Sequence, residues 1–422
     1  MNHKVKKLLA MVMIVCMVFA LAACKSQNQA SGSSAKTAPV EITFTNFSAS
    51  GGNEETLAAM YEEFQKVHPD IKVNIETIGY DDYFTQMQTR VAGGTAADCY
   101  ELNIENFAAY SSKGILAEIS DVDTAKFNQT ALGAFAVDGK QYGLPGSFSN
   151  VVLFYNKDLF DQAGMAYPTD AWTWDDAQAA AEAIRALSAD TFGIYVPATY
   201  HEFYKVSAQY GGSLLNDSKT EFTIDSPENL TAATLLVERI TKTNVMPTSA
   251  QLGGMGDWDL FESGRLGMIV TGIWAFAPFA EACDFPWDIS VEPGGIKKAT
   301  HFFSNAFVVN EESKNKEAAA AWINFLASSD ETAAIRIKAG WDLPAIVDES
   351  VLNEYLKLSP PENRQAVFDS LDYLVTPPII EEYSLMTDII SKKLEAAASG
   401  KLSVAEALKQ AQEECGAQIT LK

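Results

Sequence analysis

Aromatic, amide and carboxylate side chains gather in three short loops that follow predicted strands. Residues 46–53 read NFSASGGN, residues 103–106 read NIEN, and residues 272–276 read GIWAF. The indole of Trp274 offers a flat face that can stack on the apolar side of a ring, while Asn and Glu side chains can share hydrogen bonds with hydroxyl groups. Together these groups are suited to holding a polar solute that contains rings.

The sequence lacks the usual patterns of covalent or metal-assisted catalysis. It has no Gly-x-Ser-x-Gly elbow, no His-Glu-x-x-His and no Walker loop, and GGMGDWD lacks the third glycine of a dinucleotide loop. Paired acids such as Glu54 and Glu55 could serve glycoside hydrolysis, but neighbouring acids on a helix are normally solvated. We therefore expect a binding protein without cofactor or metal, with a secreted glycoside-acting enzyme as the alternative.

The composition is that of a globular, strongly acidic protein. Of the 422 residues, 47% are hydrophobic and 20% are charged, and the formal net charge is −24. This length suggests two or more domains. So acidic a surface repels phosphate backbones, which argues against nucleic-acid binding and leaves neutral or cationic ligands open. The cysteines of the exported part, Cys99, Cys283 and Cys415, are odd in number and widely spaced, so buried free thiols are expected.

An export signal begins the chain. Sixteen apolar residues, 8–23, follow Lys4, Lys6 and Lys7, and this run is shorter than the roughly twenty residues of a bilayer span. Residues 21–24, Leu-Ala-Ala-Cys, resemble the lipobox of bacterial lipoproteins, which implies cleavage after residue 23 and a lipid on Cys24. Residues 24–39 contain no large apolar side chain after the cysteine. This composition predicts a flexible linker. A plain secretory signal is the alternative.

Strands and helices alternate along the rest of the chain. Strands are predicted at 40–47, 71–78 and 97–103, with helices at 54–70, 80–94 and 104–120. A strand, a helix and a strand within about forty residues form a βαβ unit, which indicates a parallel sheet. Later elements include a helix capped by Thr173 and two C-terminal helices broken at residues 399–400. Because these units appear too many for one sheet, the fold class expected is α/β with two doubly wound lobes.

Four segments together resemble the family 1 extracellular solute-binding proteins of ABC importers, the class that includes maltose- and other oligosaccharide-binding lipoproteins. The segments are residues 152–164 followed by WTWDDA, residues 261–276, residues 313–334 with AGWDLPA, and AASGKLSVAEALKQAQ. The resemblance implies a type II periplasmic-binding-protein fold whose chain crosses between the lobes near residues 147–150, 303–305 and 343–348. Lobe 1 would comprise residues 40–148 and 303–343, and lobe 2 residues 149–302 and 344–422.

The resemblance also implies a ligand site in the cleft between the lobes. Trp274 matches a sugar-stacking Trp of the maltose-type members, and the NIEN loop matches one that carries an acidic and a basic residue there. Here that loop supplies Glu105 and Asn106, with Asn103 close by, so the basic residue is replaced by Asn. The further candidates are Ser147, Phe148 and Ser149 at the first crossing, Tyr200, His201 and Tyr204 in a loop that contributes aromatics, and Asn46, Ser48, Asp82, Tyr83, Asn305 and Trp341. The indoles of Trp172, Trp174 and Trp322 are assigned to packing.

These expectations describe a receptor that captures a carbohydrate of the oligosaccharide class and delivers it to the transmembrane subunits of an ABC permease. The protein would be a monomer, held by its lipid on the outer face of the cytoplasmic membrane. A polyamine or other cationic solute is the alternative ligand class, because Glu105 and the acids at 81–82 could face it. An adhesin or sensor that binds sugar without transport would use the same pocket.

Overall fold

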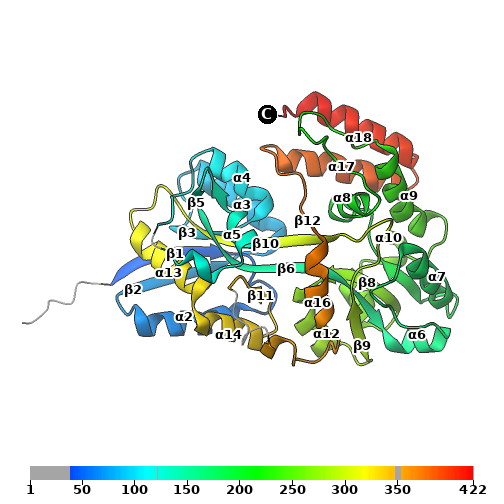
Figure 1. The fold of residues 1–422 in the computed structure, drawn as a ribbon, viewed down its shortest axis with the longest axis horizontal. Coiled ribbons are helices and arrows are strands. Elements are labelled where there is room, and N and C mark those ends of the chain that lie inside the picture. Colours follow the sequence, from blue (N-terminus) through cyan, green and yellow to red (C-terminus); the bar gives the residue numbers. More distant parts are fainter. Residues whose placement is uncertain (1–38, 121, 347–352, 422) are drawn as a thin grey trace, which may run out of the picture. The chain divides into compact units, whose positions relative to one another are not determined.

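The computed structural model describes residues 39–120, 122–346 and 353–421 (Figure 1). The predicted signal peptide, the lipidation at Cys24 and the linker up to residue 38 lie outside these residues, as does the end of the third predicted crossing at 347–348. Within the described ranges, none of the helices combines the length and the apolar character that a membrane span requires.

The N-terminal strands form a parallel half-sheet, as the βαβ pattern predicts. Strand β1 (Val40–Asn46) pairs in parallel with β2 (Ile71–Thr77) on one side and with β3 (Cys99–Asn103) on the other. The connections are the helices α2 (Glu54–Val67) and α3 (Tyr80–Ala92). Helix α2 buries Leu57, Met60 and Phe64, whose spacing places them on one face of a helix, so its amphipathic pattern accounts for its packing.

Two long strands in the middle of the chain run antiparallel to their neighbours. Strand β10 (Thr300–Val309) pairs with β3 and with β6 (Gly143–Asn156), and β6 continues into pairs with β8 (Leu266–Gly272) and β9 (Trp287–Ser290). The strand order is β2-β1-β3-β10-β6-β8-β7, with β7 (Phe192–Tyr195) parallel to β8. The expectation of too many units for one sheet is therefore wrong, because the long strands β6 and β10 connect both sets of strands into one mixed sheet.

The predicted crossing at 147–150 falls within β6, where its pairing changes. Residues up to Asn150 pair with β10, and Val151 onward pair with β8. Every residue of β6 is buried. The predicted crossing at 303–305 falls within β10, and the start of the third lies in β11 (Leu343–Pro344), which pairs with Phe148 and Ser147. The division of the chain into two lobes at these positions stays a prediction.

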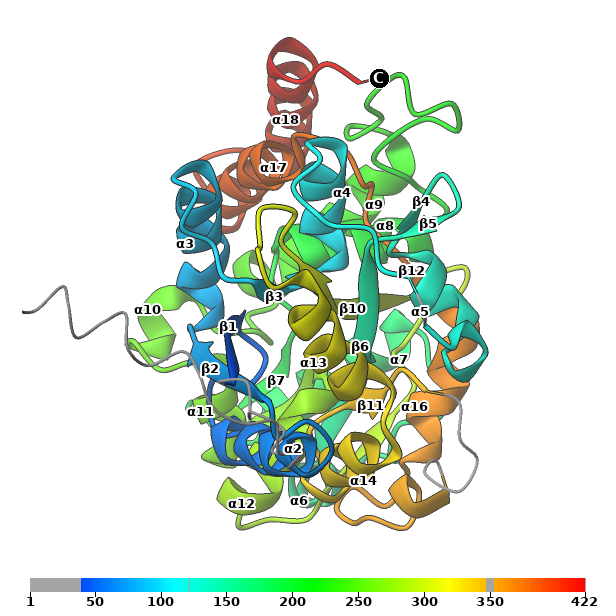
Figure 2. The ribbon, with the colours of Figure 1, turned by 90° about the vertical axis from the view of Figure 1, so that its left-hand side faces the viewer.

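Helices cover both faces of the sheet (Figures 1 and 2). The remaining helices of the described residues are α4 (Ile104–Ser112), α5 (Gln129–Gly133), α6 (Lys157–Ala163), α7 (Trp174–Arg185), α8 (Tyr200–Gln209), α9 (Pro227–Thr241), α10 (Ser249–Leu252), α11 (Asp257–Glu262), α12 (Phe276–Ala282), α13 (Lys316–Ser328), α14 (Asp330–Lys338), α16 (Gln365–Asp369), α17 (Tyr383–Ala398) and α18 (Val404–Gln418). The short remainder consists of the strands β4 (Ala136–Val137), β5 (Lys140–Gln141) and β12 (Leu374–Val375) and the 3-10 helices η1 (Thr124–Lys126), η2 (Ile273–Ala275) and η3 (Ser370–Tyr373).

Local signals in the sequence set several helix ends. Thr173 caps α7 in a capping box with Asp176, as predicted, and α17 and α18 are separated at Ser399 and Gly400. Helix α17 also contacts α4 and α8, which brings the C-terminal part of the chain next to the turn after β3. This contact matters because it completes the wall of the site described below.

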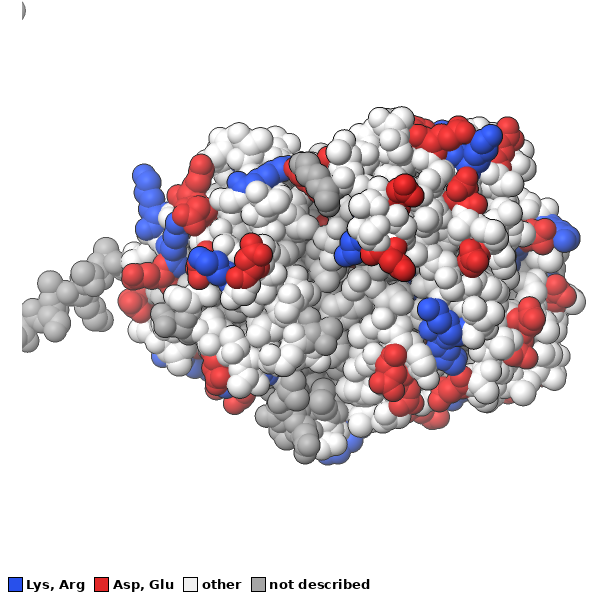
Figure 3. Space-filling view, turned by 45° about the horizontal axis from the view of Figure 1, so that its top comes forward, with Lys and Arg blue, Asp and Glu red and all other residues white. Residues whose placement is uncertain are grey.

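Two of the three indoles assigned to packing lie in the interior, whereas Trp172 is half-buried. Trp174 and Trp322 are fully buried, and the guanidinium of Arg239 stacks on the Trp174 ring. The cysteines at 99, 283 and 415 are free thiols, as expected, although that of Cys283 is only half-buried. On the face drawn in Figure 3, acidic and basic side chains are interspersed over the described residues without an extended basic patch.

Candidate functional site: a cavity bordered by α3, α4, α8 and α17

A cavity of about 250 Å³ lies where four helices approach the carboxyl end of β3. Its lining residues are Tyr80, Phe84, Asn103, Asn106, Thr199, Tyr200, His201, Tyr383, Thr387, Asp388 and Ser391. Four of them, Asn103, Asn106, Tyr200 and His201, are among the residues predicted for the site. The cavity combines aromatic rings with amide, hydroxyl and imidazole groups, which is the chemistry of a site for a polar solute.

Helix α4 begins inside this wall because Asn103 caps it. The side-chain oxygen Oδ1 of Asn103 accepts hydrogen bonds from the backbone N–H of Asn106 at 3.2 Å and from Asn106 Nδ2 at 2.8 Å. The cap therefore fixes both amides at the point where β3 gives way to α4. The NIEN sequence predicts this arrangement, because Asn at the end of a strand favours a helix start.

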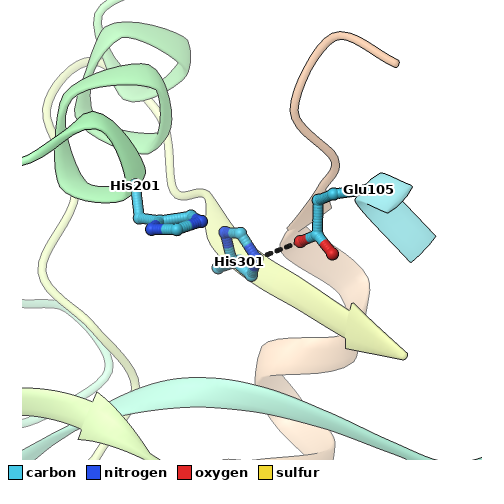
Figure 4. A group of neighbouring side chains, drawn as sticks. All are labelled: Glu105, His201 and His301. Carbon is cyan, nitrogen blue, oxygen red and sulfur yellow. Dashed lines mark ion pairs between the residues drawn. The ribbon is translucent and has the colours of Figure 1, made fainter. Parts of the chain in front are cut away.

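Glu105, His201 and His301 converge beside the cavity (Figure 4). They come from α4, α8 and β10, and one nitrogen or carboxylate oxygen atom of each lies within 4.8 Å of those of the other two. His301 Nε2 is 3.5 Å from Glu105 Oε1, and His301 Nδ1 contacts the hydroxyl of Tyr204. We call Glu105, His201, His301 and Tyr204 the cleft cluster.

Burial shapes the protonation of this cluster. Loss of solvent raises the pKa of the Glu105 carboxyl, an effect that the nearby His201 opposes. Burial, with His301 next to it, lowers the pKa of His201 to about 4. Burial and then the charge of Lys205 lower the pKa of His301 well below its usual value. Both imidazoles are therefore neutral at pH 7, so each has one nitrogen lone pair available.

Trp274 connects to the cleft cluster through a second aromatic residue. Its ring is 37% exposed and meets the Phe303 ring edge to face at 5.2 Å between centroids. Phe303 in turn lies 3.4 Å from the His301 ring and 6.0 Å from the His201 ring, measured between centroids. The exposed indole that stacking requires is thus present. Phe303 connects it to the cleft cluster through successive ring contacts, which we call the aromatic chain.

A glycine makes room for this indole. Trp274 lies in η2 directly after β8, and a Cβ atom on Gly272 would overlap the six-membered part of the Trp274 ring. The ring therefore rests against the backbone at the end of the strand. The sequence GIWAF thus gives the indole its orientation as well as its place in the chain.

Five residues that the sequence predicted for the site lie away from the cavity. The Asn46 amide is buried and bonds to Glu76, Thr77 and Ala49. Tyr83 is buried and donates to the backbone oxygen of Glu101. Ser48 N and Phe47 N donate to the Glu101 carboxylate, Asp82 is exposed on α3, and Trp341 is 4% exposed with the Arg336 guanidinium over its ring. None of these five residues lines the cavity.

The residues predicted at the crossings lie in the middle of the sheet. Ser147, Phe148 and Ser149 are buried in β6, and Asn305 in β10 pairs with Ser147 on one side and with Asn103 on the other. This register places Asn305 next to the cap of α4. Whether any of these side chains contacts a solute stays a prediction.

Sequence reasoning missed several residues of the site. Tyr80 and Phe84 lie four positions apart and so share one face of α3, and helical spacing from Tyr80 could have found Phe84. Tyr383 comes from α17, and His301 and Phe303 come from β10. No local pattern signals these three, because they reach the site through pairing between distant segments.

The family of bacterial extracellular solute-binding proteins matches residues 49–333, about two thirds of the chain. The chain belongs to this family. Its members and the relatives described next are binding proteins rather than enzymes, and the family resemblance predicted from the sequence is confirmed. The fold class is also confirmed, since the mixed α/β structure matches solved solute-binding proteins of the periplasmic type.

Among solved structures, this solute-binding protein resembles the ABC substrate-binding protein Lmo0181 from Listeria monocytogenes in complex with cycloalternan. The two are 44% identical, with 91% of this chain and 100% of that chain covered and a TM-score of 0.88. A galactooligosaccharide-binding protein of Bacillus subtilis is 24% identical over 99% of this chain and 98% of its own length. A putative binding protein of Brucella abortus is 27% identical over 87% of this chain and 90% of its own.

Proposed function

We propose that this solute-binding protein captures an oligosaccharide at the cavity bordered by α3, α4, α8 and α17. The observation that carries the proposal is the 44% identity, over 91% of the chain, to a protein in complex with cycloalternan. A relative named for galactooligosaccharide binding that matches 99% of the chain supports the same ligand class.

The side chains around the cavity suit a saccharide. Asn103, Asn106 and His201 can exchange hydrogen bonds with hydroxyl groups, and Tyr200 and Tyr80 offer ring faces and phenol groups. Trp274 adds an exposed indole face beyond Phe303. We assign Trp274 to stacking on a sugar ring and the amide and imidazole groups to hydroxyl recognition.

Entry of an oligosaccharide requires the walls of the cavity to separate. The cavity of about 250 Å³ is smaller than the roughly 300–1,000 Å³ of pockets that hold drug-sized ligands. We propose that residues 40–148 with 303–343 and residues 149–302 with 344–422 move as two lobes about β6, β10 and the segment after β11. Ligand contacts to α3 and α4 on one side and to α8 and α17 on the other would then favour the closed form.

The receptor acts outside the cell as part of a transport system. We propose that Cys24 carries a lipid that holds the protein on the outer face of the cytoplasmic membrane, and that residues 25–39 act as the tether. The closed monomer would deliver its ligand to the transmembrane subunits of an ABC permease. The ligand would leave the protein chemically unchanged.

Calorimetric titration with a ligand panel tests this proposal. We expect cycloalternan and linear gluco-oligosaccharides to bind and to raise the melting temperature, with small-angle scattering recording compaction of the protein. Spermidine serves as the cationic comparison, because Glu105 is acidic and near the cavity. Heat released by spermidine alone would overturn the carbohydrate assignment, and chromatography that revealed shortened saccharides after incubation would establish a glycoside-acting enzyme instead.

A further inference from the structure

The fold brings three potential metal ligands of the cleft cluster close together, with one ligand atom of each within 4.8 Å of the others. Tetrahedral zinc has bonds of about 2.0–2.2 Å to nitrogen and oxygen, so neighbouring ligand atoms lie about 3.4 Å apart. His301 Nε2 and Glu105 Oε1 are 3.5 Å apart, and all ligand atoms lie within 4.8 Å of one another. Shifts of about 1 Å in side-chain rotamers therefore bring the set to metal-binding distances.

Two of these side chains are buried without a hydrogen-bond partner. Glu105 is 2% exposed and His301 is 1% exposed, and both oxygens of Glu105 and Nε2 of His301 lack a partner. A buried carboxylate without a donor is costly. A cation between the carboxylate and the imidazole nitrogen, either a proton or a metal ion, offsets that cost.

Tyr204 fixes the ring nitrogen that His301 presents. Its hydroxyl contacts Nδ1, which leaves Nε2 directed at Glu105 (Figure 4). An oxygen partner on the outer nitrogen is the usual support of a metal-binding imidazole, because it sets the tautomer and the ring orientation. The cluster therefore has both a set of inward-facing ligands and one outer contact that holds a ligand in place.

The surrounding charges permit a cation here. The buried ammonium of Lys205 acts electrostatically on His301, and its Nζ is 2.9 Å from carboxylate oxygens of both Glu202 and Glu292, which offset its charge. Metal binding uses the neutral form of an imidazole, so the ion would compete with protons for both rings. The net charge of −24 draws cations toward the protein as a whole.

We propose that Glu105, His201 and His301 form a binding site for one divalent transition-metal cation of the zinc class. Two imidazoles and one carboxylate favour Zn²⁺, Co²⁺ and Ni²⁺ over Ca²⁺ and Mg²⁺, which prefer sets of oxygen ligands. Three protein ligands leave one position of a tetrahedral ion open to water or to a solute oxygen. The ion would join α4 to α8 and β10, and this proposal does not depend on the identity of the saccharide.

Metal titration of the full chain, purified in detergent without a histidine tag and stripped with a chelator, tests the proposal. ZnCl₂ alone should bind with a stoichiometry of one per chain at pH 7.5, whereas CaCl₂ and MgCl₂ should release no heat. Co²⁺ should give the intense visible absorption of a four-coordinate ion without a cobalt–thiolate band. A thiolate band, or no zinc binding, would overturn the site.

Matched variants locate the ion. We expect Glu105→Gln, His201→Gln and His301→Gln each to weaken zinc binding by on the order of a hundredfold or more, and Tyr204→Phe by roughly ten- to a hundredfold. His68→Gln is the control, because His68 stacks on Phe64 outside the cluster and should leave zinc affinity unchanged. Circular dichroism shows which variants are folded, and the half-buried His201 provides the safest one. Unchanged affinity in folded His201→Gln would refute the proposal.

Discussion

Helix α8 contributes to two buried sets of polar side chains, which differ in whether their charges have close partners. On one side, the ammonium of Lys205 lies 2.9 Å from Glu202 and 2.9 Å from Glu292, and Gln209 donates to Glu292 as well. We call Glu202, Lys205, Gln209 and Glu292 the paired network. On the other side, His201 lies close to Glu105, whose oxygens have no hydrogen-bond partner, and Tyr204 contacts His301.

This difference distinguishes buried charges that stabilise the fold from buried charges that await a ligand. A buried charge with a close partner of opposite sign keeps a helix in place, whereas a buried carboxylate left without donors costs free energy that the fold must supply elsewhere. Proteins retain such costs mainly where a ligand, proton or metal ion offsets them. The contrast on α8 therefore supports the proposal that binding takes place on the side of the cleft cluster.

The largest expected effect comes from Lys205→Met. Removing this cation leaves the carboxylates of Glu202 and Glu292 buried without their partner, so the free energy of unfolding should fall by about 3–5 kcal/mol. Urea denaturation followed by circular dichroism measures this change. Lys242→Met is the control, because its ion pair with Glu238 is exposed and should contribute less than about 1 kcal/mol. Equal losses in both variants would remove the distinction between the paired network and a surface pair.

Glu101→Gln tests a carboxyl group that is intermediate between the ion-paired carboxylates of the paired network and the unpartnered carboxylate of Glu105. The Glu101 carboxylate accepts two backbone hydrogen bonds, yet burial raises its pKa from 4.5 to about 7. The folded state therefore holds this proton more tightly than the unfolded chain. Its contribution to stability falls as pH rises from about 4.5 to about 7, and stays level above that.

The variant should remove that part of the pH dependence. Relative to the original protein, Glu101→Gln should gain on the order of 3 kcal/mol in unfolding free energy at pH 8, with no difference at pH 4. Urea denaturation across this range provides the comparison. A difference that is the same at both pH values would mean that the carboxyl of Glu101 titrates alike in the folded and unfolded chains.

Trp274→Ala tests the exposed end of the aromatic chain. The ring is 37% exposed, so its loss should weaken oligosaccharide binding at least about tenfold, or about 1.4 kcal/mol, while the melting temperature changes little. Trp172→Ala is the matched control, because Trp172 packs near Phe160 and should affect stability rather than affinity. Loss of stability without loss of affinity in Trp274→Ala would place that indole in the core.

The smallest effect is expected for Glu105→Gln measured with metal removed. The carboxylate has no donor to lose, so a neutral amide of the same shape should leave the unfolding free energy unchanged or raise it by up to about 1 kcal/mol. Thermal unfolding in chelator buffer at pH 7.5 measures it. A decrease above about 2 kcal/mol would show that Glu105 has a stabilising partner, as the carboxylates of the paired network do.

The local sequence pattern predicted most helices and strands, but little of how the strands pair in the sheet. The βαβ units, the cap at Thr173 and the buried indoles of Trp174 and Trp322 follow from hydrophobic period and capping chemistry, which act over a few residues. The antiparallel joining of β6 to β10 and β8 does not follow, because register across more than a hundred residues leaves no trace in one strand.

The same limit applies to the site. Asn103, Asn106, Tyr200 and His201 were predicted because the segments that carry them resemble binding loops of the family, and all four line the cavity. Tyr383 and His301 were missed, since a tyrosine at the start of α17 and a histidine within β10 look like ordinary surface or strand residues until the chain folds. Asn46 and Tyr83 resemble site residues by position, but backbone groups nearby occupy their polar atoms.

The overlap between Gly272 and the Trp274 ring has a consequence for how this receptor could change its ligand over evolutionary time. A single added methyl group at residue 272 would tilt the indole off the strand without deleting it, and so redirect the surface offered to a passing sugar. A substitution at residue 272 can thus change ligand specificity by reorienting the indole ring, while the residues that stabilise the fold stay the same.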